Sequence, residues 1–228
     1  MVVSLHYDIP QKGIKKVAII FQKNNIENNI SPKEYSGYIY AKETIESLVY
    51  RRSGFNIIML GDSHTCHNNW GELLNRDDIA NFGIGGDGTE SIIKRINDVS
   101  LVSPSKCFLM IGINDIFGGK SLDEIEKNYE TIIKYLKKDN IEIIIQSVLC
   151  VSELSERLGH DWKKINKKVF DLNSRLEKLA IGYDIKYVDI NQLLLENNNL
   201  NNSYTSGDGV HLNKDGYERW CNEIKKHL

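Results

Sequence analysis

The chain has 228 residues, a formal charge of −2 and a pI near 6.3. A charge so close to zero argues against a nucleic-acid partner or an anionic membrane surface. Hydrophobic residues make up 41% of the chain, as in an ordinary soluble globular protein. At this length a single α/β domain buries roughly 70–75% of its unfolded surface, so its core needs no disulfide or metal.

The cysteines and the N-terminus favour a cytoplasmic setting. The four cysteines are widely spaced and form no C-x-x-C pair: Cys66, Cys107, Cys150 and Cys221. We expect free thiols. Residues 1–8 lack the basic and apolar regions of a signal peptide, and no segment approaches the roughly 18 apolar residues of a membrane span. We therefore expect a cytoplasmic protein without a membrane span.

The first 53 residues carry the weakest pattern. Val17–Phe21 could form a strand, Gln22–Pro32 is a polar, Asn-rich loop, and Ala41–Arg52 has helical apolar spacing. We predict an N-terminal extension or accessory segment over residues 1–53 and a separate domain over residues 54–228.

From Phe55 onward, apolar runs alternate with helical segments. The predicted strands are Ile57–Leu60, Ile79–Phe82, Cys107–Ile111, Ile141–Val148 and Lys186–Ile190. The predicted helices are Trp70–Leu74, Thr89–Val99, Leu122–Lys138, Asp161–Ile181 and Lys214–His227, and the stretch Asn197–Ser206 is expected to be a loop. This alternation predicts βαβ units. The fold is therefore an α/β three-layer sandwich with a five-stranded parallel sheet, of the flavodoxin-like kind.

Polar or glycine-rich groups follow these strands. They are Gly61-Asp62-Ser63-His64, the glycine turn Gly83–Gly88, Gly112-Ile113-Asn114-Asp115 and, just before the last helix, Asp208-Gly209-Val210-His211. The C-terminal ends of parallel strands share one edge of the sheet, where such folds bind their ligands. We expect the four groups to meet in one crevice.

These four segments, in this order, resemble the four blocks of the SGNH (GDSL-type) hydrolase family. The run Asn81–Asp87 is similar to the branch with the platelet-activating-factor acetylhydrolase catalytic subunits. The resemblance covers residues from about Phe55 to the C-terminus. One departure is His64, where the family motif has leucine.

The resemblance implies a role for each matching residue. Ser63 would be the nucleophile, His211 its general base and Asp208 the acid that orients the imidazole. The backbone N–H groups of Ser63 and Gly86 and the amide of Asn114 would form the oxyanion hole, with Asp62 and Asp87 in supporting positions. The chemistry agrees, since a serine nucleophile needs a base and that base needs an orienting group.

Several other interpretations compete at single positions. Gly83-x-Gly85-x-x-Gly88 matches a dinucleotide fingerprint, but no acid ends the next strand. His64 and His67 could be metal ligands, although solvent-facing or structural roles fit them better. Asp208 could also cap the last helix. A further set could border the crevice, pack in the core or lie on the solvated surface: Trp162, Asn166 and Asn173.

The resulting hypothesis is a serine esterase that cleaves short-chain or O-acetyl esters of carbohydrates or lipids and needs no cofactor. Three alternatives stay open: an acyltransferase to a sugar hydroxyl, a lysophospholipase or thioesterase, and a ligand-binding member without catalysis. The expected partner is a small-molecule, carbohydrate or lipid ester, without nucleic acid, and a homo-oligomer is possible.

Overall fold

The computed structural model describes residues 54–228. The strand, loop and helix predicted within residues 1–53 lie outside the described residues. The domain boundary predicted at residue 53 therefore stays a prediction.

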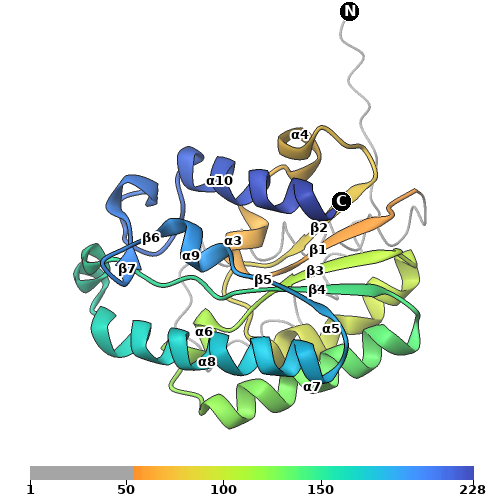
Figure 1. Cartoon of the computed structure of the whole chain (residues 1–228), viewed down its shortest axis with the longest axis horizontal. Coiled ribbons are helices and arrows are strands. Elements are labelled where there is room, and N and C mark those ends of the chain that lie inside the picture. Colours follow the sequence, from red (N-terminus) through yellow and green to blue (C-terminus); the bar gives the residue numbers. More distant parts are fainter. Residues whose placement is uncertain (1–53) are drawn as a thin grey trace, which may run out of the picture. The chain divides into compact units, whose positions relative to one another are not determined.

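A five-stranded parallel sheet forms the centre of the described part, with strand order β2-β1-β3-β4-β5 (Figure 1). The strands are β1 Ile57–Gly61, β2 Ile79–Gly83, β3 Lys106–Met110, β4 Glu142–Gln146 and β5 Lys186–Val188. Every residue of β1 is buried, as its unbroken apolar sequence predicts for a strand covered on both faces. This order is the flavodoxin-like one.

Helices cover both faces of the sheet (Figure 1). One face carries α5 Thr89–Val102, α7 Leu122–Lys138 and α8 Trp162–Gly182, and the other carries α4 Trp70–Leu74, α9 Ile190–Leu194 and α10 Lys214–Ile224. Two apolar clusters correspond to the two faces, one including Tyr129 of α7 and the other Trp220 of α10. The predicted three-layer sandwich is confirmed.

Helix α7 shows how closely pattern and structure agree. Ser121 caps its N-terminus in a capping box with Glu124, and the residues at helical spacing are buried: Ile125, Tyr129, Ile132, Ile133 and Leu136. The Tyr129 hydroxyl donates to the Ile111 carbonyl at 2.6 Å and so satisfies its polar end in the core.

Several short elements near the sheet edge were not predicted. They are α3 Ser63–Cys66, α6 Ile113–Phe117, the 3₁₀ turns η1 Glu153–Leu158 and η2 Asn202–Tyr204, and the hairpin of β6 Leu195–Glu196 with β7 Asn199–Leu200. The predicted loop 197–206 thus contains β7 and η2. The last helix is α-helical to Ile224, and its predicted final turn to His227 is the 3₁₀ turn η3 Lys225–His227.

The fourth strand ends at Gln146 instead of the predicted Val148, because the chain then leaves the sheet. Asparagine side chains replace the missing strand partner. Asn173 pairs with both the N–H and the C=O of Val148, and Asn166 does the same for Val151, all at 2.8 Å. Both asparagines are buried, so the core-packing interpretation applies to these two residues.

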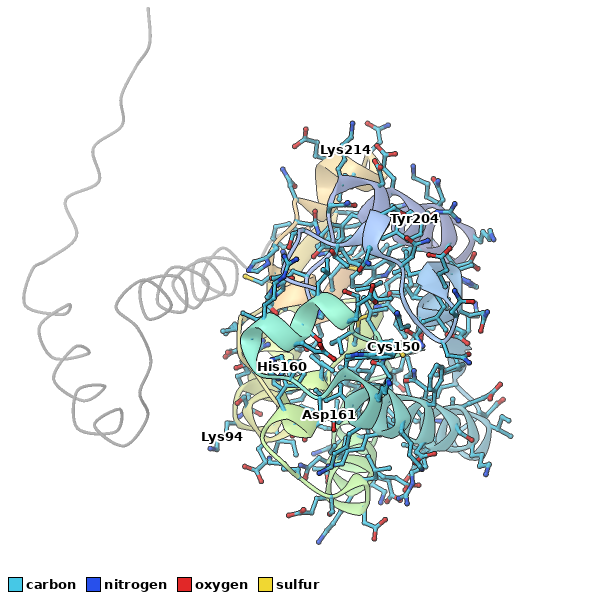
Figure 2. The ribbon with its side chains drawn as sticks, turned by 90° about the vertical axis from the view of Figure 1, so that its left-hand side faces the viewer. Lys94, Cys150, His160, Asp161, Tyr204 and Lys214 are labelled. Carbon is cyan, nitrogen blue, oxygen red and sulfur yellow. The ribbon has the colours of Figure 1, made fainter. Side chains whose placement is uncertain are left out.

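The same segment carries one of the four free cysteines. Cys150 lies in the interior, while His160 and Asp161 mark the start of α8 (Figure 2). Within residues 54–228, no helix is both long and apolar enough to cross a membrane.

Candidate active site

The candidate nucleophile stands at the junction of β1 and a one-turn helix. Ser63 is the first residue of α3, and the buried Asp62 caps this helix by accepting from the N–H of His64 at 3.0 Å. The helix packs closely against the end of β2. A Cβ added to Gly83 would lie only 2.3 Å from the backbone nitrogen of Cys66. The position of Ser63 therefore depends on Asp62 and on a glycine in the neighbouring strand.

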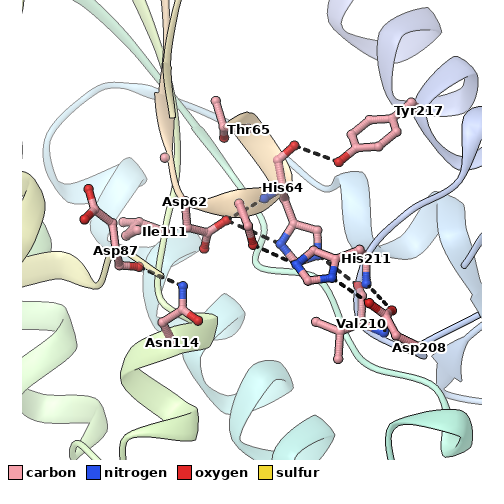
Figure 3. Close-up of polar contacts among 12 residues, drawn as sticks. Asp62, His64, Thr65, Asp87, Ile111, Asn114, Asp208, Val210, His211 and Tyr217 are labelled. Atoms are coloured by element: carbon pink, nitrogen blue, oxygen red, sulfur yellow. Dashed lines mark hydrogen bonds and ion pairs between the residues drawn. The ribbon is translucent and has the colours of Figure 1, made fainter. Parts of the chain in front are cut away.

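Ser63 and His211 meet although 148 residues separate them. The Ser63 Oγ lies 2.9 Å from His211 Nε2, and His211 Nδ1 lies 2.7 Å from Asp208 Oδ2 (Figure 3). A carboxylate only accepts, so Nδ1 carries the hydrogen and Nε2 is left to accept from the serine hydroxyl. Hydroxyl, imidazole and carboxylate thus form one line of hydrogen bonds.

Asp208 orients the loop as well as the ring. Its Oδ1 accepts from the backbone N–H of Val210 at 2.8 Å and of His211 at 2.9 Å. Partial burial acts to raise the pKa of Asp208, but the hydrogen bonds from His211 and from the two backbone groups outweigh it and lower the pKa to about 2. The expectation that Asp208 caps the last helix is wrong: Asn213 caps α10.

A contact that the sequence did not reveal anchors this loop. The N–H of Ser152 donates to the carbonyl of Gly209 at 2.8 Å. Gly209 has φ +78°, and a Cβ there would lie 2.4 Å from the nitrogen of Ser155. Only glycine fits both conditions, so the residue between Asp208 and Val210 lets the loop approach η1.

The glycine turn and Asn114 lie beside the nucleophile. A Cβ on Gly85 would be 3.9 Å from the Ser63 Cβ, and Asn114 Nδ2 donates to the Asp87 carbonyl at 2.9 Å (Figure 3). Within residues 54–228, neither the Ser63 N–H nor the Gly86 N–H has a protein acceptor. These N–H groups and the second amide hydrogen of Asn114 are therefore available to an incoming oxygen atom.

The GDSL-like Lipase/Acylhydrolase family matches residues 59–219, which include all of these side chains. The chain belongs to this family. The resemblance to SGNH (GDSL-type) hydrolases seen in the sequence is thereby confirmed.

Relatives of this GDSL-like protein include two curated proteins. N-acylneuraminate cytidylyltransferase of Streptococcus agalactiae is 24% identical over 200 residues, 85% of this chain and 45% of that protein. Platelet-activating factor acetylhydrolase IB subunit alpha2 of Rattus norvegicus is 24% identical over 159 residues, 68% of this chain and 66% of that protein. The chain thus spans less than two thirds of either relative.

Solved structures show the same fold as this GDSL-like protein. A Streptococcus pneumoniae protein described as a platelet activating factor has a TM-score of 0.74 at 24% identity, covering 93% of this chain and 98% of that one. An acetyl-xylooligosaccharide esterase of Geobacillus has a TM-score of 0.63 at 19% identity, covering 76% and 94%.

In this GDSL-like site, Asp87 shapes the turn. Its carboxylate accepts from Arg95 Nε at 2.8 Å, while Arg95 Nη2 donates to the Phe82 carbonyl at 2.8 Å and to that of Gly61 at 3.2 Å. Arg95 therefore ties the turn to the ends of β1 and β2. Burial raises the pKa of Asp87 to about 6, although the charge and hydrogen bond of Arg95 act to lower it.

Asp115 helps to position Asn114, and the sequence had suggested no role for Asp115. Its buried carboxylate accepts from both the N–H and the hydroxyl of Thr89 at 2.8 Å. A Cβ on Gly88 would lie 2.9 Å from this carboxylate. Asp115 thus holds the start of α6, and with it Asn114, against the start of α5.

The two histidines near the nucleophile differ. His67 is exposed, as the solvent-facing interpretation expects, and its ring centroid is 5.1 Å from that of His211. His64 is buried, so the structural interpretation applies to it and the solvent-facing one is wrong. Within the described residues, no group of three or more His, Cys, Asp or Glu side chains could hold a metal ion.

Proposed function

We propose that the protein is a serine esterase that cleaves carboxylic esters through an acyl-enzyme. The observation that carries this proposal is the continuous line from Ser63 Oγ to His211 at 2.9 Å and from His211 to Asp208 at 2.7 Å. A serine hydroxyl is a weak nucleophile unless a positioned base removes its proton, and this line supplies that base and its orienting carboxylate.

In the first half-reaction, Ser63 Oγ attacks the ester carbonyl carbon while His211 Nε2 takes the hydroxyl proton. The negative charge that develops on the carbonyl oxygen is held by the N–H groups of Ser63 and Gly86 and by the amide of Asn114. Asp208 stabilises the imidazolium. The C–O bond to the alcohol then breaks, and His211 gives its proton to the leaving oxygen.

In the second half-reaction, His211 removes a proton from water, which attacks the acyl carbon on Ser63 Oγ. The same donors hold the oxyanion, the serine oxygen leaves with the proton from His211, and the carboxylic acid is released. Apart from the ester and the attacking water, each step uses groups of the chain itself.

Short acyl groups, and O-acetyl groups on carbohydrates or lipids in particular, are the proposed substrates. Two named proteins support this choice: an acetylhydrolase among the relatives and an acetyl-xylooligosaccharide esterase among the structures of the same fold. The other relative, N-acylneuraminate cytidylyltransferase, is named for a carbohydrate, which also favours a carbohydrate substrate.

Hydrolysis of p-nitrophenyl acetate, butyrate and octanoate by the full chain tests the proposal. We expect a burst of p-nitrophenol and the fastest turnover with acetate, both absent in Ser63→Ala. Cys66→Ala is the matched control: it removes the nearby thiol and should keep the burst. If no ester of any length is cleaved, a ligand-binding role is favoured, and release that rises with an added sugar acceptor would indicate acyl transfer.

A further inference from the structure

His64 connects the two segments that carry the proposed nucleophile and base. It follows Ser63 directly, and its Nε2 lies 2.9 Å from the carbonyl oxygen of Val210, the residue just before His211. The contact therefore joins the immediate chain neighbours of the two side chains that must meet. The His64 and His211 ring centroids are 5.6 Å apart (Figure 3).

The surroundings of His64 determine where its hydrogens lie. A carbonyl only accepts, so Nε2 carries a hydrogen and donates to Val210. The other ring nitrogen, Nδ1, faces Asp62 Oδ1 at 3.4 Å. Burial acts to lower the pKa of His64, but the hydrogen bond and charge of Asp62 outweigh it and raise the pKa. The donor to Val210 does not depend on this shift, because a neutral ring with its hydrogen on Nε2 makes the same bond.

The contact with His64 also means that both backbone polar groups of Val210 are hydrogen-bonded. The N–H of Val210 donates to Asp208, while its carbonyl accepts from His64, so both polar groups of this buried residue are fixed. His64 is itself held by Asp62 at its N–H and by the Tyr217 hydroxyl, 2.9 Å from its carbonyl. Neither segment can shift without breaking a buried hydrogen bond.

We propose that His64 is a positioning residue that sets the distance between the Ser63 hydroxyl and the His211 ring. This inference rests on the proposed serine-esterase function. Misplacing reacting groups by about 1 Å can lower a rate roughly 10²-fold, so a donor at this point affects the chemical step more than substrate binding.

The experiment compares His64→Leu, which cannot donate, with His64→Gln, whose Nε2 amide can. For p-nitrophenyl acetate we expect His64→Leu to lower kcat roughly 10- to 100-fold with KM nearly unchanged. His64→Gln should recover most of this loss. Asn173→Leu is the matched control, because it removes buried hydrogen bonds that do not involve His64 and should lower Tm while kcat per titrated serine stays near that of the parent.

Two results would overturn the proposal. One is an unchanged kcat in His64→Leu. The other is a loss of kcat that is equal in His64→Leu and His64→Gln and matches the fall in the amount of serine titrated by a fluorophosphonate. That result would mean that His64 only supports folding.

A measurement without substrate separates this proposal from the proposed function. The exchange rate of the His211 Nδ1 proton, followed by NMR, should rise in His64→Leu and stay near the parent value in His64→Gln. If the parent cleaves no ester, the esterase proposal fails, while the exchange rates still show whether His64 fixes the His211 loop. Equal exchange rates in the parent and in both His64 variants would contradict the proposed positioning role of His64.

Discussion

The side-chain amide of Asn114 donates to the backbone carbonyl of Asp87 at 2.9 Å. This bond joins the start of α6 to the glycine turn and uses one of the two amide hydrogens. The second amide hydrogen is left for substrate, and the bond to Asp87 holds it beside the backbone N–H of the neighbouring Gly86.

Asn114→Ala should therefore lower kcat of ester hydrolysis by roughly 10²–10³ with little change in KM, since the lost donor acts on charge that develops in the transition state. Steady-state kinetics with p-nitrophenyl acetate measures both constants. A kcat within about twofold of the parent would remove Asn114 from the oxyanion hole.

Asp208→Asn should change how stability depends on pH. Because the folded-state pKa of Asp208 is about 2, below its ordinary value, its carboxylate stabilises the fold above pH 4, and this contribution is lost as the pH falls toward 2. Urea unfolding of the parent and of Asp208→Asn between pH 5 and 2 measures the free energy of unfolding of each protein. The difference in free energy of unfolding between the parent and Asp208→Asn should shrink as the pH falls. A constant difference would contradict the stabilising role of the Asp208 carboxylate.

Gly83→Ala should disturb the nucleophile helix from the neighbouring strand. The new methyl group would stand 2.3 Å from the Cys66 nitrogen, and overpacking against backbone costs about 1–3 kcal/mol. We expect a lower Tm and reduced serine labelling by a fluorophosphonate. The matched control is Gly182→Ala in the exposed last turn of α8, where a Cβ meets nothing within 4 Å. Equal Tm values for the two variants would contradict the clash.

Asn173→Leu should destabilise the fold without changing the chemistry. It leaves the N–H and C=O of Val148 buried without their side-chain partners, and each such group costs roughly 1–3 kcal/mol. Urea unfolding should show the loss, while kcat per titrated serine should match the parent. A fall in kcat per site would indicate that the 147–152 segment also tunes catalysis.

The sequence by itself determined the layers, the strands of the sheet and the residues that gather at its edge. Unbroken apolar runs such as Ile57–Leu60 are typical of strands buried on both faces, and parallel strands place their ends together. Local chemistry also pointed to Asp208 and His211, since three residues of separation let one turn present both side chains.

Only the tertiary structure decided how these residues are held. The contacts of His64 with Val210, Ser152 with Gly209 and Asn173 with Val148 join positions 146, 57 and 25 residues apart. Hydrophobic periodicity reports which face of an element is buried, but it carries no information about the partner of a single buried polar group. Such a partner is chosen by the packing of distant segments, because a buried donor or acceptor must be paired once the core has closed.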